Sequence, residues 1–210
     1  TVYQRCRQQR QLIIDNFPKL NRFLTGYDLR HVFNDEMTEF DLTRILTGSE
    51  GTLAFITEAR LDITRLPKVR RLVNVKYDSF DSALRNAPFM VEARALSVET
   101  VDSKVLNLAR EDIVWHSVSE LITDVPDQEM LGLNIVEFAG DDEALIDERV
   151  NALCARLDEL IASHQAGVIG WQVCRELAGV ERIYAMRKKA VGLLGNAKGA
   201  AKPIPFAEDT

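Results

Sequence analysis

The spacing of apolar residues changes at Leu66-Pro67-Lys68, and this change constrains the fold more than any other feature of the chain. Proline fixes its own backbone and restricts the residue before it, so the tripeptide marks a boundary. After the boundary, alternating apolar residues predict strands at 71–77, 95–101, 130–139 and 168–174. Helical spacing predicts helices at 79–95, 141–165 and 180–194. The resulting order is a ferredoxin-like βαββαβ unit followed by one helix, which is an α+β fold.

The segment 141–165 is the clearest of the expected helices. Asp141 or Asp142 can cap its N-terminus, and apolar residues recur on one face from Ile146 to Ile161. We expect the helix at 79–95 to be interrupted at Pro88, since proline removes a backbone donor. The segment 106–126 mixes polar and apolar residues without a clear period, so its structure is left open.

Residues 1–66 have a different pattern. The first 24 residues have helical spacing that breaks at Pro18, and residues 34–41 are acidic, as in an exposed loop. Residues 53–63 alternate apolar and polar positions toward their end, which predicts a strand.

The charge of the chain is unevenly distributed. The formal net charge is −6, but residues 77–186 carry −13 and the last 24 residues carry +3. An acidic middle argues against broad nucleic-acid binding, which needs a basic stripe. The basic cluster (Arg187, Lys188, Lys189, Lys198 and Lys202) is either a solvated helix end or a site for a small anion.

Other counts exclude several kinds of site. Three widely separated cysteines form no disulfide framework, and no histidine pair has metal-ligand spacing, so we expect no metal site in the chain. No apolar run is long enough for a membrane span, and we expect a reduced, cytoplasmic setting. The chain begins with Thr1 and stops at Thr210 directly after an apolar run, so we expect a piece of a longer protein.

A glycine-containing run precedes the expected strand at 53–63. Gly48-Ser49-Glu50-Gly51-Thr52 places two glycines three residues apart, which lets a backbone approach a flat or anionic ligand. Taken alone, the run is neither a dinucleotide fingerprint nor a P-loop, and it is also typical of a plain tight turn.

Its neighbours carry a resemblance to a known family. The run from Leu46 to Ala59 (LTGSEGTLAFITEA) resembles a signature of FAD-linked 2-hydroxyacid dehydrogenases of the vanillyl-alcohol-oxidase superfamily. The earlier run Thr25-Gly26-Tyr27-Asp28-Leu29 resembles the companion motif of that family. The resemblance implies that residues 1–66 are the end of an FAD-binding α+β domain. It also implies that residues 67–210 form a truncated substrate-side cap domain of the FAD-linked oxidase C-terminal type.

The resemblance also implies a cofactor site. The family places this loop against FAD, which assigns flavin contacts to Gly48, Ser49, Glu50, Gly51, Thr52 and Ile56. Ala54 departs from the glycine usual in the family, and alanine tolerates only ordinary backbone angles.

A substrate clamp is implied in the basic cluster. Arg187 and Lys202 have the separation of an Arg and a Lys that hold substrate carboxylates in D-2-hydroxyglutarate-oxidising members. An Arg fork binds a carboxylate bidentately, and a Lys adds a point charge. Val191 stands where those members have a Thr, which leaves the identity of the hydroxy acid open. The alternative is that Arg187 is a helix-surface cation and Lys202 a solvated loop residue.

The implied activity is oxidation of a D-2-hydroxy acid, of the D-2-hydroxyglutarate or D-lactate type, to the 2-keto acid. Hydride would pass to FAD, and a 4Fe-4S cluster outside this chain, or another acceptor, would take the electrons. The catalytic acid/base and metal ligands of the family lie outside the chain, so we expect it to be inactive alone. The alternative is a ferredoxin-like binding or regulatory module without redox activity.

Overall fold

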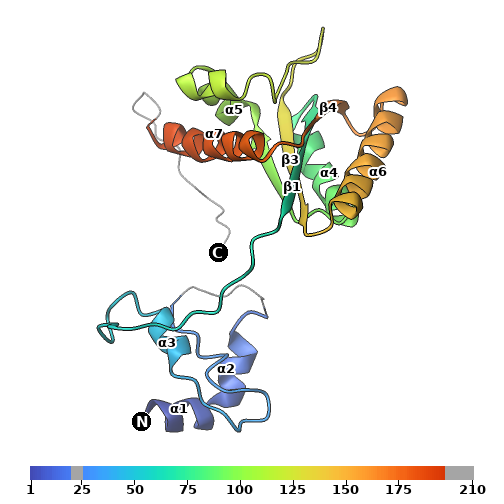
Figure 1. Cartoon of the computed structure of the whole chain (residues 1–210). Coiled ribbons are helices and arrows are strands. Elements are labelled where there is room, and N and C mark those ends of the chain that lie inside the picture. The colour runs from blue at the N-terminus through green and yellow to red at the C-terminus, as the bar shows by residue number, and fades with distance from the viewer. Residues whose placement is uncertain (20–25, 197–210) are drawn as a thin grey trace. The chain divides into compact units, whose positions relative to one another are not determined.

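The computed structural model describes residues 1–19 and 26–196, with Val191 described by its backbone only. The chain divides into two compact units, the first over Thr1–Ile63 and the second over Thr64–Ile204. Residues 20–25 and 197–210 lie outside the described part of the chain. Figure 1 shows the two units.

The second unit is built on a four-stranded antiparallel sheet. Its strands are β1 (Val69–Tyr77), β2 (Ser97–Asp102), β3 (Gly132–Gly140) and β4 (Val168–Cys174). They lie in the order β2-β3-β1-β4, with Val73 opposite Val136 at the centre and opposite Val173 toward the edge. This order separates β1 from β2 by one strand, as in a ferredoxin-like βαββαβ sheet. The predicted α+β fold is confirmed.

Two helices cover one face of the sheet (Figure 1). They are α4 (Phe80–Glu92) and α6 (Glu143–Ala162), and their N-termini are capped by the side chains of Ser79 and Asp142. Their buried residues pack against the odd-numbered β1 positions, and the core of this face includes Val73, Val75, Tyr77, Met90, Phe138, Val150, Leu153 and Leu157. The apolar stripe predicted for 141–165 is therefore the buried side of α6.

The other face of the sheet is covered by a second helical layer. It consists of α5 (Ser103–Arg110), the 3-10 helix η1 (Ile113–Ser117) and α7 (Leu177–Gly195). Its core includes Leu72, Leu106, Ala109, Ile122, Leu133, Ile135, Val180, Ile183 and Met186. The segment 106–126, which sequence patterns left open, thus contributes to this layer together with the last helix.

The expected interruption at Pro88 is wrong, because α4 continues through this residue. Proline removes the hydrogen bond to the carbonyl four residues earlier, which belongs to Leu84. Leu84 and Pro88 are both exposed, so water can hydrate that carbonyl without a buried unsatisfied acceptor.

The described part of the first unit contains three short helices: α1 (Val2–Gln8), α2 (Arg10–Asn16) and α3 (Thr43–Thr47). They enclose a small core formed by Cys6, Ile13, Val32, Phe33 and Ile45. The rings of Tyr3, Phe33 and Phe40 meet with centroids 5.1–5.3 Å apart, which joins α1 to the loop before α3.

The strand expected at 53–63 is not formed. This segment has no regular secondary structure, and Phe55 is 100% and Ile63 93% exposed. A strand requires a neighbour to pair its backbone groups, and no strand of the described residues lies beside it. The segment 53–63 therefore has the apolar–polar alternation of a strand, but no strand of the described structure pairs with it.

Candidate functional site

The two motifs that resemble the flavin family lie against each other in the first unit. A Cβ added to Gly48 would lie 1.7 Å from the carbonyl oxygen of Gly26, a separation that no side chain tolerates. The hydroxyl groups of Tyr27 and Thr52 are 3.3 Å apart, which links the same two segments a second time. Glycine at position 48 is thus required by close packing between the motifs.

The loop after Gly48 is fixed by its own hydrogen bonds. The buried Ser49 hydroxyl donates to the carbonyl oxygen of Leu46 (2.8 Å), and the Thr52 hydroxyl donates to that of Ser49 (2.6 Å). Glu50 and Gly51 both have positive φ, 48° and 79°, so the chain reverses at this point. The turn is therefore a defined backbone shape rather than a loose connection.

The outer surface of this loop is open, and this feature tests whether it suits FAD. Glu50, Gly51 and Thr52 are exposed, and a Cβ added to Gly51 would meet nothing within 4 Å. An uncovered backbone without a side chain at Gly51 fits the close approach of a flat or anionic group. The residues present therefore fit a flavin nucleotide.

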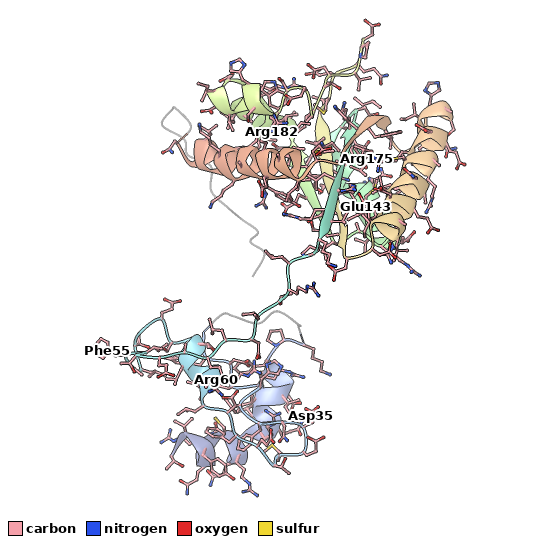
Figure 2. The ribbon with its side chains drawn as sticks, viewed as in Figure 1. Asp35, Phe55, Arg60, Glu143, Arg175 and Arg182 are labelled. Atoms are coloured by element: carbon pink, nitrogen blue, oxygen red, sulfur yellow. The ribbon has the colours of Figure 1, made fainter. Side chains whose placement is uncertain are left out.

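Ile56 belongs to the open segment that follows the loop. Its side chain is 70% exposed, and Phe55 beside it extends into solvent, as Figure 2 shows. The structure thus places Ile56 after the loop, exposed, and without the strand that was expected to position it.

Arg187 lies in a pocket of the second unit. The pocket has a volume of about 220 Å³ and lies between β2, α5 and α7, with apolar walls that include Val101, Leu106 and Met186. Arg187 lines it from α7, and its guanidinium forms an ion pair with the carboxylate of Glu99 on β2. The Arg187 side chain is 43% exposed, which leaves part of the guanidinium accessible.

A buried carboxylate fixes α7 one turn before Arg187. Glu137 on β3 is 5% exposed, and it accepts hydrogen bonds from Arg70 Nε (2.6 Å), Ser97 Oγ (3.4 Å) and the Tyr184 hydroxyl. Burial, aided by the Glu137 carboxylate, raises the pKa of Tyr184 to about 12, so its hydroxyl stays protonated and donating. These donors come from β1, β2 and α7, so this contact ties the helix to the sheet.

The rest of the basic cluster has other surroundings or is not described. Lys189 pairs with Asp112, the N-cap residue of η1, at 2.7 Å. Lys202 and Lys198 lie outside the described residues, as does the side chain of Val191. Of the predicted clamp, the structure therefore places Arg187 alone, at the pocket.

The three cysteines are buried free thiols. Burial raises the pKa of each, for Cys154 to about 11, which disfavours the thiolate form. Within residues 1–19 and 26–196, no three His, Cys, Asp or Glu side chains are grouped to hold a metal ion. No helix among these residues is long and apolar enough to cross a membrane.

Sequence patterns missed the acidic partners of this site. Glu99 and Glu137 come from strands, whereas Tyr184 and Arg187 come from the last helix, and such distant pairs leave no local spacing to detect. One signal was present, since Glu137 is the one charged residue in the strand at 130–139, whose other polar side chain is Asn134. A carboxylate at such a position requires buried donors.

Comparisons with known proteins connect these features to a family. The family model for the C-terminal domain of FAD-linked oxidases matches residues 66–210. A D-2-hydroxyglutarate dehydrogenase of Pantoea ananatis is 77% identical over 209 residues, covering all of this chain and 20% of the relative. The proteins of the same name from Haemophilus influenzae and Pseudomonas putida are 66% and 46% identical, covering all of this chain and 20% and 21% of each relative.

The chain thus spans about one fifth of the length of these relatives. The match of the family model covers the whole sheet and both helical layers of the second unit. This chain belongs to the family of FAD-linked oxidases, and its match to the C-terminal domain of that family begins at residue 66.

Proposed function

We propose that the full-length protein oxidises a D-2-hydroxy acid, of the D-2-hydroxyglutarate type, to the 2-keto acid with FAD as cofactor. The observation that carries this proposal is the accessible Arg187 guanidinium, held at a pocket of an FAD-linked oxidase domain. An Arg fork recognises carboxylates, like phosphates, through two parallel hydrogen bonds. The similar proteins whose names specify D-2-hydroxyglutarate support the choice of acid.

In this proposal Gly48, Ser49, Glu50, Gly51, Thr52 and Ile56 contact FAD from the first unit. When bound, FAD supplies the acceptor for the hydride that leaves the hydroxyl-bearing carbon of the substrate. The chain's own contribution is a rigid, open turn, because the Ser49 and Thr52 hydroxyls bond backbone carbonyls and leave the outer surface uncovered. The division into an FAD-binding part at 1–66 and a cap domain at 67–210 remains part of the proposal.

Arg187 and Lys202 hold the carboxylates of the acid in this proposal. The guanidinium fixes one carboxylate in a plane, which orients the hydroxyl-bearing carbon. D-2-hydroxyglutarate carries two carboxylates, so a second cation such as Lys202 matches its remaining charge. D-lactate carries one carboxylate and leaves the second cation unused, so we propose the dicarboxylic acid as the preferred substrate.

We further propose that a 4Fe-4S module elsewhere in the full-length protein, or a separate acceptor, takes the electrons. The cluster would need ligands outside the described part of this chain. Its three cysteines are buried and not grouped, whereas such a cluster requires four thiolates close together.

The test is a dye-linked assay of the full-length protein with D-2-hydroxyglutarate, D-lactate and glycolate. We expect the highest kcat/KM with D-2-hydroxyglutarate, and we expect Arg187→Ala to lower it by about a hundredfold or more, as loss of a charged hydrogen-bonding partner does. The matched control is Arg182→Ala. Arg182, labelled in Figure 2, lies on the same helix. It has the same 43% exposure, but it pairs with Glu120 and is not among the residues that line the pocket.

The outcome separates the proposal from its alternatives. Turnover that is equal in Arg187→Ala and Arg182→Ala would remove Arg187 from the clamp. Absence of turnover with all three acids would leave the hydroxy-acid assignment without support.

A further inference from the structure

Glu99 and Arg187 form an ion pair, and both residues line the pocket. Glu99 reaches Arg187 Nη2 through Oε2. The Glu99 side chain is 30% exposed, and Arg187 is the one ionic partner that the described residues give it. A carboxylate of the protein therefore already occupies one terminal nitrogen of the guanidinium.

The charge of the pocket makes this contact unusual for an anion site. Among the described residues, its lining holds one cation, Arg187, and two carboxylates, Glu99 and Asp102. Asp102 is committed elsewhere, because its carboxylate accepts the backbone N–H of Val105 at the N-terminus of α5 (2.8 Å). Glu99 is thus the acid whose charge is directed at the guanidinium.

We propose that Glu99 is a built-in competitor for the substrate carboxylate, neutralising Arg187 in the empty site and giving way when the acid binds. This inference rests on the proposed function, since it requires Arg187 to bind the acid. An Arg fork presents two parallel donors to one carboxylate. A substrate carboxylate that approaches the guanidinium through Nη2 competes there with the Glu99 oxygen and is repelled by its charge. Glu99 is therefore a positioning residue that sets the affinity of the site.

The surrounding structure allows this exchange without moving the helix. Glu137 holds Tyr184 one turn earlier on α7, and Met186 and Ala190 pack into the core on either side of Arg187. The position of the Arg187 backbone thus depends on these contacts and not on Glu99. We expect Glu99→Gln, which keeps the shape and removes the charge, to fold as the unmodified protein does.

The experiment uses the full-length protein and two readouts, KM for D-2-hydroxyglutarate and the Kd of its keto product 2-oxoglutarate measured by calorimetry. We expect Glu99→Gln to lower both constants about two- to fivefold, which is the range by which a partly exposed ion pair shifts an equilibrium. We expect kcat to remain unchanged, because Glu99 contacts no reacting atom in this account. The matched control is Glu120→Gln, which removes the ionic partner of Arg182, an arginine on the same helix as Arg187. This substitution should change neither KM nor Kd.

A double variant identifies the route of the effect. In an Arg187→Ala background, Glu99→Gln should lower KM and Kd by a smaller factor, because only the repulsion between Glu99 and the acid remains to be relieved. If Arg187→Ala raises KM while Glu99→Gln leaves it unchanged or raises it, the competitor role of Glu99 is wrong and the clamp stands. If Arg187→Ala leaves KM unchanged, both the clamp and the role of Glu99 are wrong.

Discussion

At the scale of single residues, Gly48 and Arg187 differ in how much of their role the sequence could reveal. The glycine motif was recognisable because the loop is contiguous, and its packing against Gly26 gives a physical reason for the residue type. Arg187 was recognisable because its separation from Lys202 resembles that of the Arg and Lys that bind substrate in the family. Its partner Glu99 was not, because an ion pair between a strand and a distant helix depends on the completed fold.

Cys154 provides a prediction at this scale. Cys154 lies on the buried side of α6, where its thiol packs in the core. Burial raises the pKa of this thiol from 9.0 to about 11. Between roughly pH 9 and 11 the unfolded chain releases this proton while the folded protein keeps it. The free energy of unfolding is therefore fully retained below pH 9 and decreases as the pH rises toward 11.

Urea unfolding at several alkaline pH values, with Cys154→Ala as the comparison, measures this dependence. The variant should lose stability less steeply between pH 9 and 11. A residual slope is expected, because the pKa of Cys174, Cys6 and Tyr184 is also raised. Parallel pH profiles for the two proteins would show that folding does not raise the pKa of Cys154.

At the scale of elements, the sheet and its helices were predictable where burial repeats with a regular period. The stripe of α6 and the alternation of β1 and β3 persist because each faces a core built from the same chain. The alternation at 53–63 has no such partner, so the same signal produced no strand. Pro88 was misjudged because its effect depends on which side of α4 it lies, and periodicity alone did not decide that.

Glu137 is expected to stabilise the contact between β3 and α7. Replacing it by alanine removes the acceptor for Arg70, Ser97 and Tyr184 and leaves these partly buried donors unpaired. We expect a loss of about 2–3 kcal/mol in the free energy of unfolding, below the value for a fully buried pair because Arg70 is 30% exposed. Denaturant unfolding measures this loss.

The control for this prediction is Glu181→Ala, at an exposed position of α7. It should change the free energy of unfolding by less than about 0.5 kcal/mol. Equal effects of the two substitutions would mean that Glu137 does not tie α7 to the sheet.

At the scale of the whole molecule, the chain covers about one fifth of its named relatives. The features that suit a flavin lie in the first unit, and the pocket with Arg187 lies in the second. The family model matches residues 66–210, which hold the pocket, whereas the loop at 48–52 precedes the match. In the proposed function, residues elsewhere in the full-length protein complete each site.

The most direct measurement is the flavin absorbance of the full-length protein after anaerobic mixing with D-2-hydroxyglutarate. The account predicts that the oxidised flavin spectrum bleaches, and that Arg187→Ala requires a much higher concentration of the acid for the same bleaching. Arg182→Ala should bleach as the unmodified protein does. A flavin spectrum that stays oxidised with D-2-hydroxyglutarate, D-lactate and glycolate alike would contradict the account.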